Sequence, residues 1–342
     1  MGMDVVPFAD EHFAAAAALL AARHRGDRAR EPHLPAAGED AAMAAAALAR
    51  VWSGEGVGGV AALRDGAMVG YLLGAPDLLH PTDWLSPFTR PRSADVPYAA
   101  HAVASDHGEA LTRRLYAVLA ARWAAAGLFA HYVAVPAADQ AALDTWFGLG
   151  FGQVMTLAVR ETGPAATGTG VAGVEFRLAT PVDGPALVPL LNDLYASFAE
   201  APTFVPQPLE TLPNLERAHA ERLDDPTGTC WVATRDGRIV AAHVFIAPES
   251  PGWFLSPLVH PERCVYLQDA ATLREEQGRG VGSALLARSL AWAREAGHAR
   301  MALHYMAASR AAEFWRGHGF RPIEHRLCRP VDERVAWGRA GS

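Results

Sequence analysis

The chain contains 342 residues, of which 51% are hydrophobic and 20% are charged, so we expect about two globular domains and not a disordered polymer. Its formal net charge of −7 gives no electrostatic reason to expect nucleic acid or an anionic membrane as a partner. All 30 basic residues are arginine, which excludes Schiff-base chemistry and the attachment of pyridoxal phosphate, because both need a lysine.

The cysteines Cys230, Cys264 and Cys328 have neither the spacing of zinc ligands nor that of a disulfide framework. We therefore expect no metal and a reducing, cytoplasmic location. The N-terminal residues are acidic where a signal peptide needs basic ones, and no run reaches the ~18 apolar residues of a membrane helix.

The first half of the chain opens with a strand-like run at 3–6, followed by an alanine-rich amphipathic helix that begins near Phe13. Two apolar runs, 57–63 and 67–74, then flank the segment Arg64-Asp65-Gly66. An Asp-Gly pair between such runs predicts a β-hairpin.

The same plan recurs about 170 residues later. In chain order the matching features are Arg-Asp-Gly at 64–66 and 235–237, Leu-Ser-Pro at 85–87 and 255–257, the helix ends at 126–127 and 296–297, and the aromatic-Gly-Phe segments 145–151 and 314–320. The four pairs of features are separated by offsets that agree within two residues, which indicates a tandem duplication.

A Gly/Thr/Ala/Pro-rich segment at 161–173 has no hydrophobic period and is interpreted as a surface linker. We predict an N-terminal domain at 1–162, a linker at 163–173 and a C-terminal domain at 174–342. Each copy has the order strand, helices, hairpin, strand, helix, strand, helix, strand, which indicates an α+β or α/β three-layer fold.

The most specific motif is Gln277-Gly278-Arg279-Gly280-Val281-Gly282, between a strand-like run and a helical run. Alternating glycines at a helix start present peptide N–H groups to an anion, which is how proteins hold a diphosphate. The spacing is neither the dinucleotide fingerprint, since Leu285 stands at its third glycine, nor the lysine-containing phosphate loop.

A strand-like run at 300–306 and the segment Ala311-Ala312-Glu313-Phe314-Trp315-Arg316-Gly317-His318-Gly319-Phe320 follow. With the glycine loop, this order resembles the GCN5-related N-acetyltransferase (GNAT) superfamily over residues 174–330. The resemblance implies two tandem GNAT domains, each with a mixed, mostly antiparallel sheet flanked by helices. It also implies that the sheet splays between its fourth and fifth strands, and that acetyl-coenzyme A is the co-substrate.

The resemblance also implies the residues that bind acetyl-coenzyme A. Its pyrophosphate would lie on Gln277, Gly278, Arg279, Gly280, Val281, Gly282 and Ser283, and its pantetheine arm along the backbone of Thr272 and Leu273. Ser309, Phe314 and Trp315 would complete the site. For Arg279, a solvated loop arginine is an equal alternative.

The first copy departs from this pattern. When 170 is subtracted from the residue numbers of the glycine loop, Gln277, Gly280 and Gly282 align with His107, Ala110 and Thr112. Arg279 aligns with Glu109. A carboxylate at a helix start repels a diphosphate. We therefore expect a degenerate N-terminal site that acts as scaffold or as one wall of the acceptor pocket.

The second copy departs as well. The family often has an asparagine seven residues before a tyrosine that protonates the departing thiolate, and here Ala308 and Trp315 occupy these places. An indole N–H does not ionise in this range. For the base that deprotonates the amine, the strands offer Asp269, His304 and Tyr305 as candidate catalytic residues. Alternation predicts that Tyr266 and Gln268 share one face of the strand and that Asp269 lies on the other.

The sequence thus predicts an N-acetyltransferase that acts on a primary amine of a small molecule by direct attack, because insertions at 75–98 and 199–222 can narrow the cleft. A monomer or a homodimer is expected. Mycothiol synthases share the tandem plan and are a specific alternative. A non-catalytic acyl-coenzyme A binder is the second alternative, motivated by the missing tyrosine.

Overall fold

The computed structural model describes residues 3–104, 106, 108–163, 170–246, 256–259 and 263–339. Both predicted Asp-Gly turns close hairpins, β2 (Gly58–Arg64) with β3 (Ala67–Asp77) and β9 (Thr229–Arg235) with β10 (Arg238–Ile246). Each turn needs two residues with positive φ, and the angles are 50° and 81° at Asp65 and Gly66 and 51° and 77° at Asp236 and Gly237.

The N-terminal copy follows the predicted order of elements. The hairpin is preceded by β1 (Met3–Pro7), α1 (Phe13–Arg30) and α2 (Ala41–Trp52). It is followed by β4 (Ser93–Val96), β5 (His101–Val103), α3 (Gly108–Ala125), β6 (Ala130–Pro136), α4 (Gln140–Gly148) and β7 (Gly152–Glu161). Glu161, the first residue of the predicted linker segment 161–173, is the last residue of β7.

The C-terminal copy repeats this order. Before its hairpin lie β8 (Glu175–Leu178), α5 (Gly184–Ser197) and α6 (Leu212–Asp224). After it come β11 (Cys264–Thr272), α7 (Val281–Glu295), β12 (Arg300–Met306), α8 (Ala311–Gly317) and β13 (Arg321–Pro330), with a final 3-10 helix at Glu333–Arg339.

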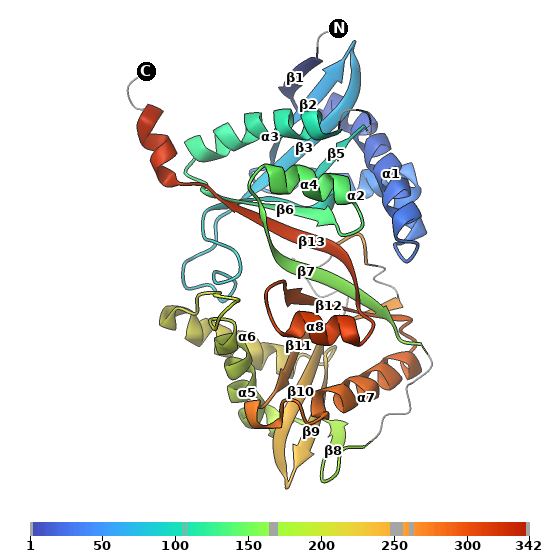
Figure 1. The fold of residues 1–342 in the computed structure, drawn as a ribbon, viewed down its shortest axis with the longest axis vertical. Coiled ribbons are helices and arrows are strands. Elements are labelled where there is room, and N and C mark those ends of the chain that lie inside the picture. The colour runs from blue at the N-terminus through green and yellow to red at the C-terminus, as the bar shows by residue number, and fades with distance from the viewer. Residues whose placement is uncertain are drawn as a thin grey trace.

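One hydrogen-bonded sheet runs through both copies, in the order β1-β2-β3-β4-β6-β13-β7-β12-β11-β10-β9-β8, with β5 attached to β3. The order is pseudo-symmetric. Reading it from β1 passes through the strands of the first copy in the same sequence as reading it from β8 passes through their counterparts in the second. The last strands are exchanged, because β13 pairs with β6 of the first copy and β7 pairs with β12 of the second. Figure 1 shows β7 and β13 crossing the middle of the molecule side by side.

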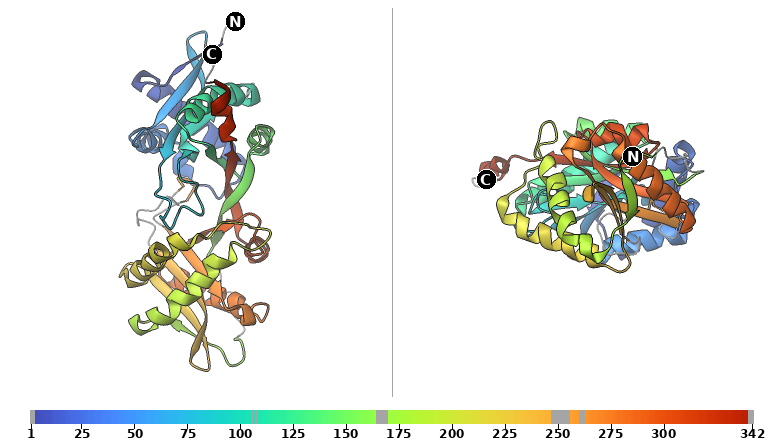
Figure 2. Two further views of the ribbon diagram at one scale, coloured as in Figure 1. Left: turned by 90° about the vertical axis from the view of Figure 1, so that its left-hand side faces the viewer. Right: turned by 90° about the horizontal axis from the view of Figure 1, so that it is seen from below.

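Helices cover both faces of the sheet. In the C-terminal copy, α5 packs through Leu187, Leu190 and Leu191 on one face, and α7 packs through Leu286 and Leu290 on the other. In the N-terminal copy, α1 and α2 lie on one side of the strands and α3 on the other (Figures 1 and 2). The α+β fold with two tandem units is therefore confirmed. The domain boundaries at 162 and 174 stay a prediction. Hydrogen bonding in the sheet continues from the strands of the first copy to those of the second.

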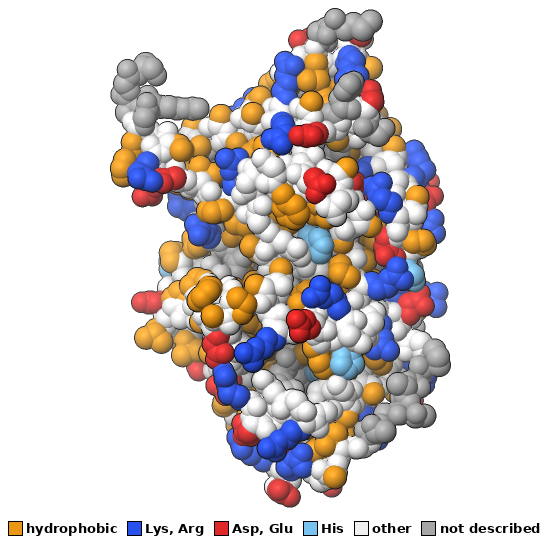
Figure 3. All heavy atoms as spheres, in the orientation of Figure 1, with side chains coloured by type: hydrophobic (Ala, Val, Ile, Leu, Met, Phe, Trp, Pro, Cys, Tyr) orange, Lys and Arg blue, Asp and Glu red, His pale blue; other side chains and the backbone are white. Residues whose placement is uncertain are grey.

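Basic and acidic side chains are interspersed over the face seen in Figure 3, in keeping with the modest net charge. Among the described residues, no helix is both long enough and apolar enough to cross a membrane.

Candidate active site

The cleft of the C-terminal copy begins where two parallel strands stop pairing. β11 and β12 pair from Cys264 and Arg300 to Leu267 and Leu303, and beyond these residues the two strands part. A strand edge that loses its partner offers peptide N–H and C=O groups to a ligand. The splay that the family resemblance implies is therefore present between β11 and β12.

A cavity of about 110 Å³ lies at this opening. Its walls come from five places in the chain. They are β11 (Tyr266, Gln268, Asp269), β12 (His304, Tyr305), the turn and helix after it (Ser309, Trp315), α5 and the residue after it (Tyr195, Phe198), and the N-terminal copy (Trp84, Phe88). The cavity thus brings together all three predicted catalytic residues, Asp269, His304 and Tyr305, and adds aromatic side chains from both copies.

The prediction that Asp269 faces away from Tyr266 is wrong. β10 pairs Val244 with Asp269 and Phe245 with Leu267, so that Gln268 is an extra residue in a β-bulge. One inserted residue reverses the alternation beyond it. Asp269 therefore lies on the same face of β11 as Tyr266, toward α5.

Asp269 is held by two partners within the fold. Its carboxylate is 2% exposed, accepts a hydrogen bond from the Tyr195 hydroxyl at 2.9 Å and forms a short ion pair with Arg222 of α6. Burial and the Asp269 charge raise the pKa of Tyr195, so its hydroxyl stays a neutral donor. The Asp269 carboxylate is thus occupied by a guanidinium and a hydroxyl from within the fold.

His304 and Tyr305 lie on opposite faces of β12. The Nδ1 atom of His304 is 2.7 Å from the Tyr266 hydroxyl, which joins the two strands across the opening. Burial, with a smaller contribution from Arg326, lowers the pKa of His304 to about 3, so the ring is neutral at physiological pH. Tyr305 is 7% exposed and packs in the hydrophobic cluster under α7 and α8.

The predicted diphosphate loop leads from β11 into α7. Gly278 and Gly280 have φ angles of 74° and 81°, a conformation that strongly favours glycine, and Gly280 is the N-cap of the helix. No heavy atom lies within 4 Å of a Cβ built on Gly278, and one on Gly280 meets only Val171, at 4.0 Å. The first peptide N–H groups of α7 have no acceptor within the helix and carry its positive end. The loop therefore has the open space and the donors that a diphosphate needs.

The other residues of the predicted loop differ in what they could offer a ligand. Gly282 lies between β11 and α8, since a Cβ there would be 3.5 Å from Thr272 Oγ1 and 3.8 Å from Phe314 Cζ. The Gln277 side chain donates to the Thr272 carbonyl at 3.1 Å, and Arg279 extends into solvent beside Glu276. Val281 is completely buried, which leaves only its backbone for a ligand.

Leu273 does not fit the expected backbone contact with the pantetheine arm. Its peptide N–H donates to the Val240 carbonyl and its own carbonyl accepts from the Glu276 N–H, both at 2.9 Å. Both groups are thus used within the protein, and Thr272 is the last residue of β11 at the opening.

Ser283 connects the first turn of α7 with the residue that follows α8. Its hydroxyl lies 3.0 Å from Nε2 of His318, whose Nδ1 lies 2.8 Å from the Phe314 carbonyl. The ring of His318 is also close to that of Phe314, with 4.1 Å between centroids. Sequence reasoning missed His318, because only the fold places it opposite the first turn of α7.

Trp315 is both a core residue and a wall of the cavity. It is 6% exposed, its ring lies 5.2 Å from that of Phe320, and it belongs to the cluster under α7. Its counterpart Trp146 is also buried, with His101 6.0 Å away. This shared packing gives Trp315 a role that needs no proton transfer.

We expect Trp315→Phe to lower the turnover number less than about tenfold, ~1.4 kcal/mol of barrier, and Trp315→Tyr to raise it. An indole cannot give a proton to the thiolate, whereas a phenol can. Steady-state kinetics measures the effect, with Trp146→Phe as a control for lost packing. A folded Trp315→Phe variant that binds coenzyme A normally but loses more than about a hundredfold in turnover would give the indole N–H a catalytic role.

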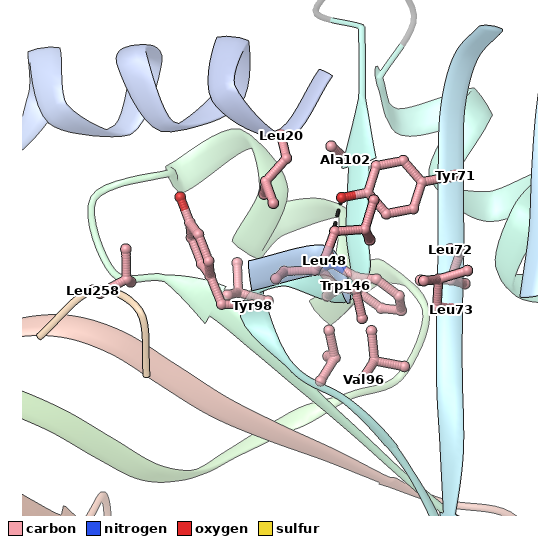
Figure 4. Packing of buried hydrophobic residues seen from close by; sticks show 14 of the residues in the cluster. Leu20, Leu48, Tyr71, Leu72, Leu73, Val96, Tyr98, Ala102, Trp146 and Leu258 are labelled. Carbon is pink, nitrogen blue, oxygen red and sulfur yellow. Dashed lines mark hydrogen bonds between the residues drawn. The ribbon is translucent and has the colours of Figure 1, made fainter. Parts of the chain in front are cut away.

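The corresponding opening of the N-terminal copy is packed with side chains. Arg23 of α1 donates to the carbonyls of His101 and Tyr98, and His101 Nε2 lies 2.9 Å from the Ala134 carbonyl of β6. The ring of Tyr98 lies between Leu20 and Leu258 (Figure 4) and its hydroxyl donates to Asp27 at 2.9 Å. These contacts close the gap between β5 and β6.

The helix start of the first copy also differs. Glu109 lies in the first turn of α3 and pairs with Arg113 at 3.0 Å, and Ala110 and Thr112 follow within the helix. His107 lies outside the described residues. In the described part of this loop, no residue has the positive φ angles of Gly278 and Gly280.

Comparisons with known proteins agree with this geometry. A sequence model of the acetyltransferase (GNAT) family matches residues 191–320, which contain the glycine loop and both splayed strands. No curated protein matches the chain significantly.

Among solved structures, a GCN5-related N-acetyltransferase from Sphaerobacter thermophilus superposes with a TM-score of 0.60 at 16% identity, over 96% of this chain and 95% of that one. The GCN5-related glucosamine N-acetyltransferase region of a fungal multi-domain GH3 β-N-acetylglucosaminidase gives a TM-score of 0.58 at 13% identity, over 96% of this chain and 38% of that one. At these identities the likeness concerns the fold. The C-terminal copy of this chain belongs to the GNAT acetyltransferase family, and the N-terminal copy, which the family model does not reach, shares its fold.

Proposed function

We propose that the C-terminal copy transfers an acetyl group from acetyl-coenzyme A to a primary amine of a small molecule by direct attack. The observation that carries this proposal is the glycine loop with positive φ angles at the start of α7, next to a cavity between two splayed strands. The loop would hold the diphosphate, and the cavity lies where the strand edges could receive the pantetheine arm and the thioester.

In such a transfer the amine lone pair attacks the thioester carbonyl carbon, a C–N bond forms, and the C–S bond then breaks with its electrons on sulfur. The unpaired edge of β11 after Leu267 is the candidate for stabilising the charge that develops on the carbonyl oxygen. Gln268, the extra residue of the bulge, follows Leu267 directly and lines the cavity.

One proton must leave the nitrogen during the attack. The Tyr266 hydroxyl lies in the cavity wall and 2.7 Å from His304 Nδ1, so a proton that reaches this oxygen can pass to the imidazole. Of the three predicted catalytic residues, we therefore assign His304 the role of base through Tyr266. The low pKa of His304 makes it a weak base that cannot deprotonate an ammonium group, so only the neutral fraction of the amine could react by this route.

Coenzyme A should bind to one site per chain. The glycine loop and the opening are present in the C-terminal copy, while Arg23, His101 and Tyr98 fill the opening of the N-terminal copy. Isothermal titration calorimetry measures the stoichiometry directly. Two equivalent sites per chain would contradict this assignment.

Turnover distinguishes an enzyme from a non-catalytic binder. Release of the coenzyme A thiol is measured while acetyl-coenzyme A is mixed with a panel of small amines. Tight binding without turnover of any amine would favour the alternative of an acyl-coenzyme A-binding protein, to which the tryptophan at 315 in place of a tyrosine also points.

A further inference from the structure

The cavity has an aromatic wall that both copies of the fold build together. Trp84 and Phe88 belong to the segment between β3 and β4 of the N-terminal copy, and Tyr195 and Phe198 lie at the end of α5. The ring of Phe88 meets the other two edge-on, at 5.6 Å from Tyr195 and 5.8 Å from Phe198. Such edge-to-face contacts fix the orientation of the rings.

The N-terminal segment is anchored on the second copy by polar contacts. Asn214 of α6 donates to the Thr82 carbonyl at 2.7 Å, and the guanidinium of Arg222 lies 5.1 Å from the centre of the Trp84 ring. Trp84 and Phe88 are only half-buried, so part of each ring remains available to a ligand in the cavity. This segment therefore forms a fixed wall of the cavity.

The charge balance of the cavity disfavours strongly polar acceptors. Asp269 is the only carboxylate among the described lining residues, and Arg222 and Tyr195 already occupy it. A polycation would bring charges that meet no free partner there, and a sugar would lose hydrogen bonds to water on entering. Polar groups of Gln268, His304 and Ser309 also line the cavity, but most of its other residues are apolar, Met155 and Leu194 among them.

The cavity is open to solvent on one side. Its volume of about 110 Å³ is smaller than the roughly 150 Å³ of an apolar cavity that encloses one benzene molecule, so a single flat ring would be only partly enclosed here. A flat group can stack on the exposed part of Trp84 or Phe88.

We propose that the two copies together form the acceptor site, and that its substrate is an amine carried on a flat apolar group no larger than about one aromatic ring. This inference rests on the proposed function and names its substrate class. The N-terminal copy thus contributes substrate selection through Trp84 and Phe88 and not through a coenzyme A site of its own.

Steady-state kinetics with benzylamine, phenethylamine, spermidine and glucosamine tests the substrate class. We expect kcat/KM for the two ring amines to exceed that for spermidine and glucosamine at least tenfold. Trp84→Ala should raise KM for benzylamine at least tenfold, ~1.4 kcal/mol, and leave the Kd of coenzyme A unchanged. The control Trp52→Ala removes a half-buried indole from the N-terminal copy, where it packs against Phe8 away from the cavity.

Direct binding separates this inference from the proposed function. Calorimetry of benzylamine with the protein saturated by desulfo-coenzyme A needs no chemistry, and Trp84→Ala should weaken this binding at least tenfold. If no amine is acetylated but benzylamine binds in a Trp84-dependent way, the acetyltransferase proposal fails and the ring-binding site stands. A preference for spermidine or glucosamine, or equal KM values and equal benzylamine binding in the wild type and Trp84→Ala, would overturn the inference.

Discussion

Replacing Gly280 with aspartate should weaken the binding of coenzyme A at least a hundredfold while leaving the fold intact. Gly280 has a φ of 81°, and aspartate is among the few other residues that adopt this conformation at small cost. Space for the side chain exists, because a Cβ at this position meets only Val171, at 4.0 Å. The new carboxylate would stand at the start of α7, where the peptide N–H groups are expected to hold the diphosphate.

Repulsion between like charges sets the size of this effect. Two unit charges 4 Å apart near a protein surface interact by about 4 kcal/mol, and 2.7 kcal/mol already corresponds to about a hundredfold in Kd. Calorimetry measures the Kd, and the thermal unfolding transition reports on the fold.

Gly297 provides the matched control. It follows the C-terminus of the same helix, has a φ of 89°, and no atom lies within 4 Å of a Cβ built on it. Gly297→Asp therefore introduces the same side chain in the same backbone conformation at the other end of α7. It should leave the Kd of coenzyme A unchanged. A folded Gly280→Asp variant that binds coenzyme A as tightly as Gly297→Asp would remove the diphosphate site from this loop.

Local signals in the sequence predicted the turns and the helix start correctly. The Asp-Gly pairs at 65–66 and 236–237 form tight hairpins because both positions of such a turn need positive φ, a requirement that two adjacent residues encode by themselves. The glycines at 278 and 280 likewise adopt positive φ before α7. Each of these features depends on residues that are neighbours in the chain.

The orientation of Asp269 could not be read from alternation. A β-bulge is an irregularity in pairing between two strands, and nothing in the residues around Gln268 marks it. The partners of Asp269 were missed for a related reason. Tyr195 and Arg222 come from two helices that are 74 and 47 residues away in the chain, so only the packing of α5 and α6 brings them to β11.

The exchange of the last strands was also beyond sequence reasoning. β7 and β13 have the apolar pattern of strands whichever copy they join, because alternation identifies the buried face and not the neighbouring strand. The exchange has a structural consequence for the site. Met155 of β7 lines the cavity of the C-terminal copy, so the candidate active site includes a strand that the first copy supplies.

Asp269→Asn should reduce the free energy of unfolding by about 3 to 5 kcal/mol. The substitution leaves the Arg222 guanidinium, which is 12% exposed, without its carboxylate, and an unpaired buried charge is costly. It also changes the acceptor of the Tyr195 hydroxyl. Chemical denaturation monitored by circular dichroism measures this change.

The double variant Asp269→Leu/Arg222→Met separates the ion pair from catalysis. Replacing both charges with apolar side chains of similar size is often neutral for stability, so the double variant should recover most of the loss. If the pair is structural, the stabilities of the single and double variants will differ by about 2 kcal/mol or more. A double variant as unstable as Asp269→Asn would show that the charge of Asp269 has another essential partner. A stable double variant whose turnover falls more than about a hundredfold, ~2.7 kcal/mol of barrier, would give the Asp269–Arg222 pair a role in the reaction and contradict a purely structural pair.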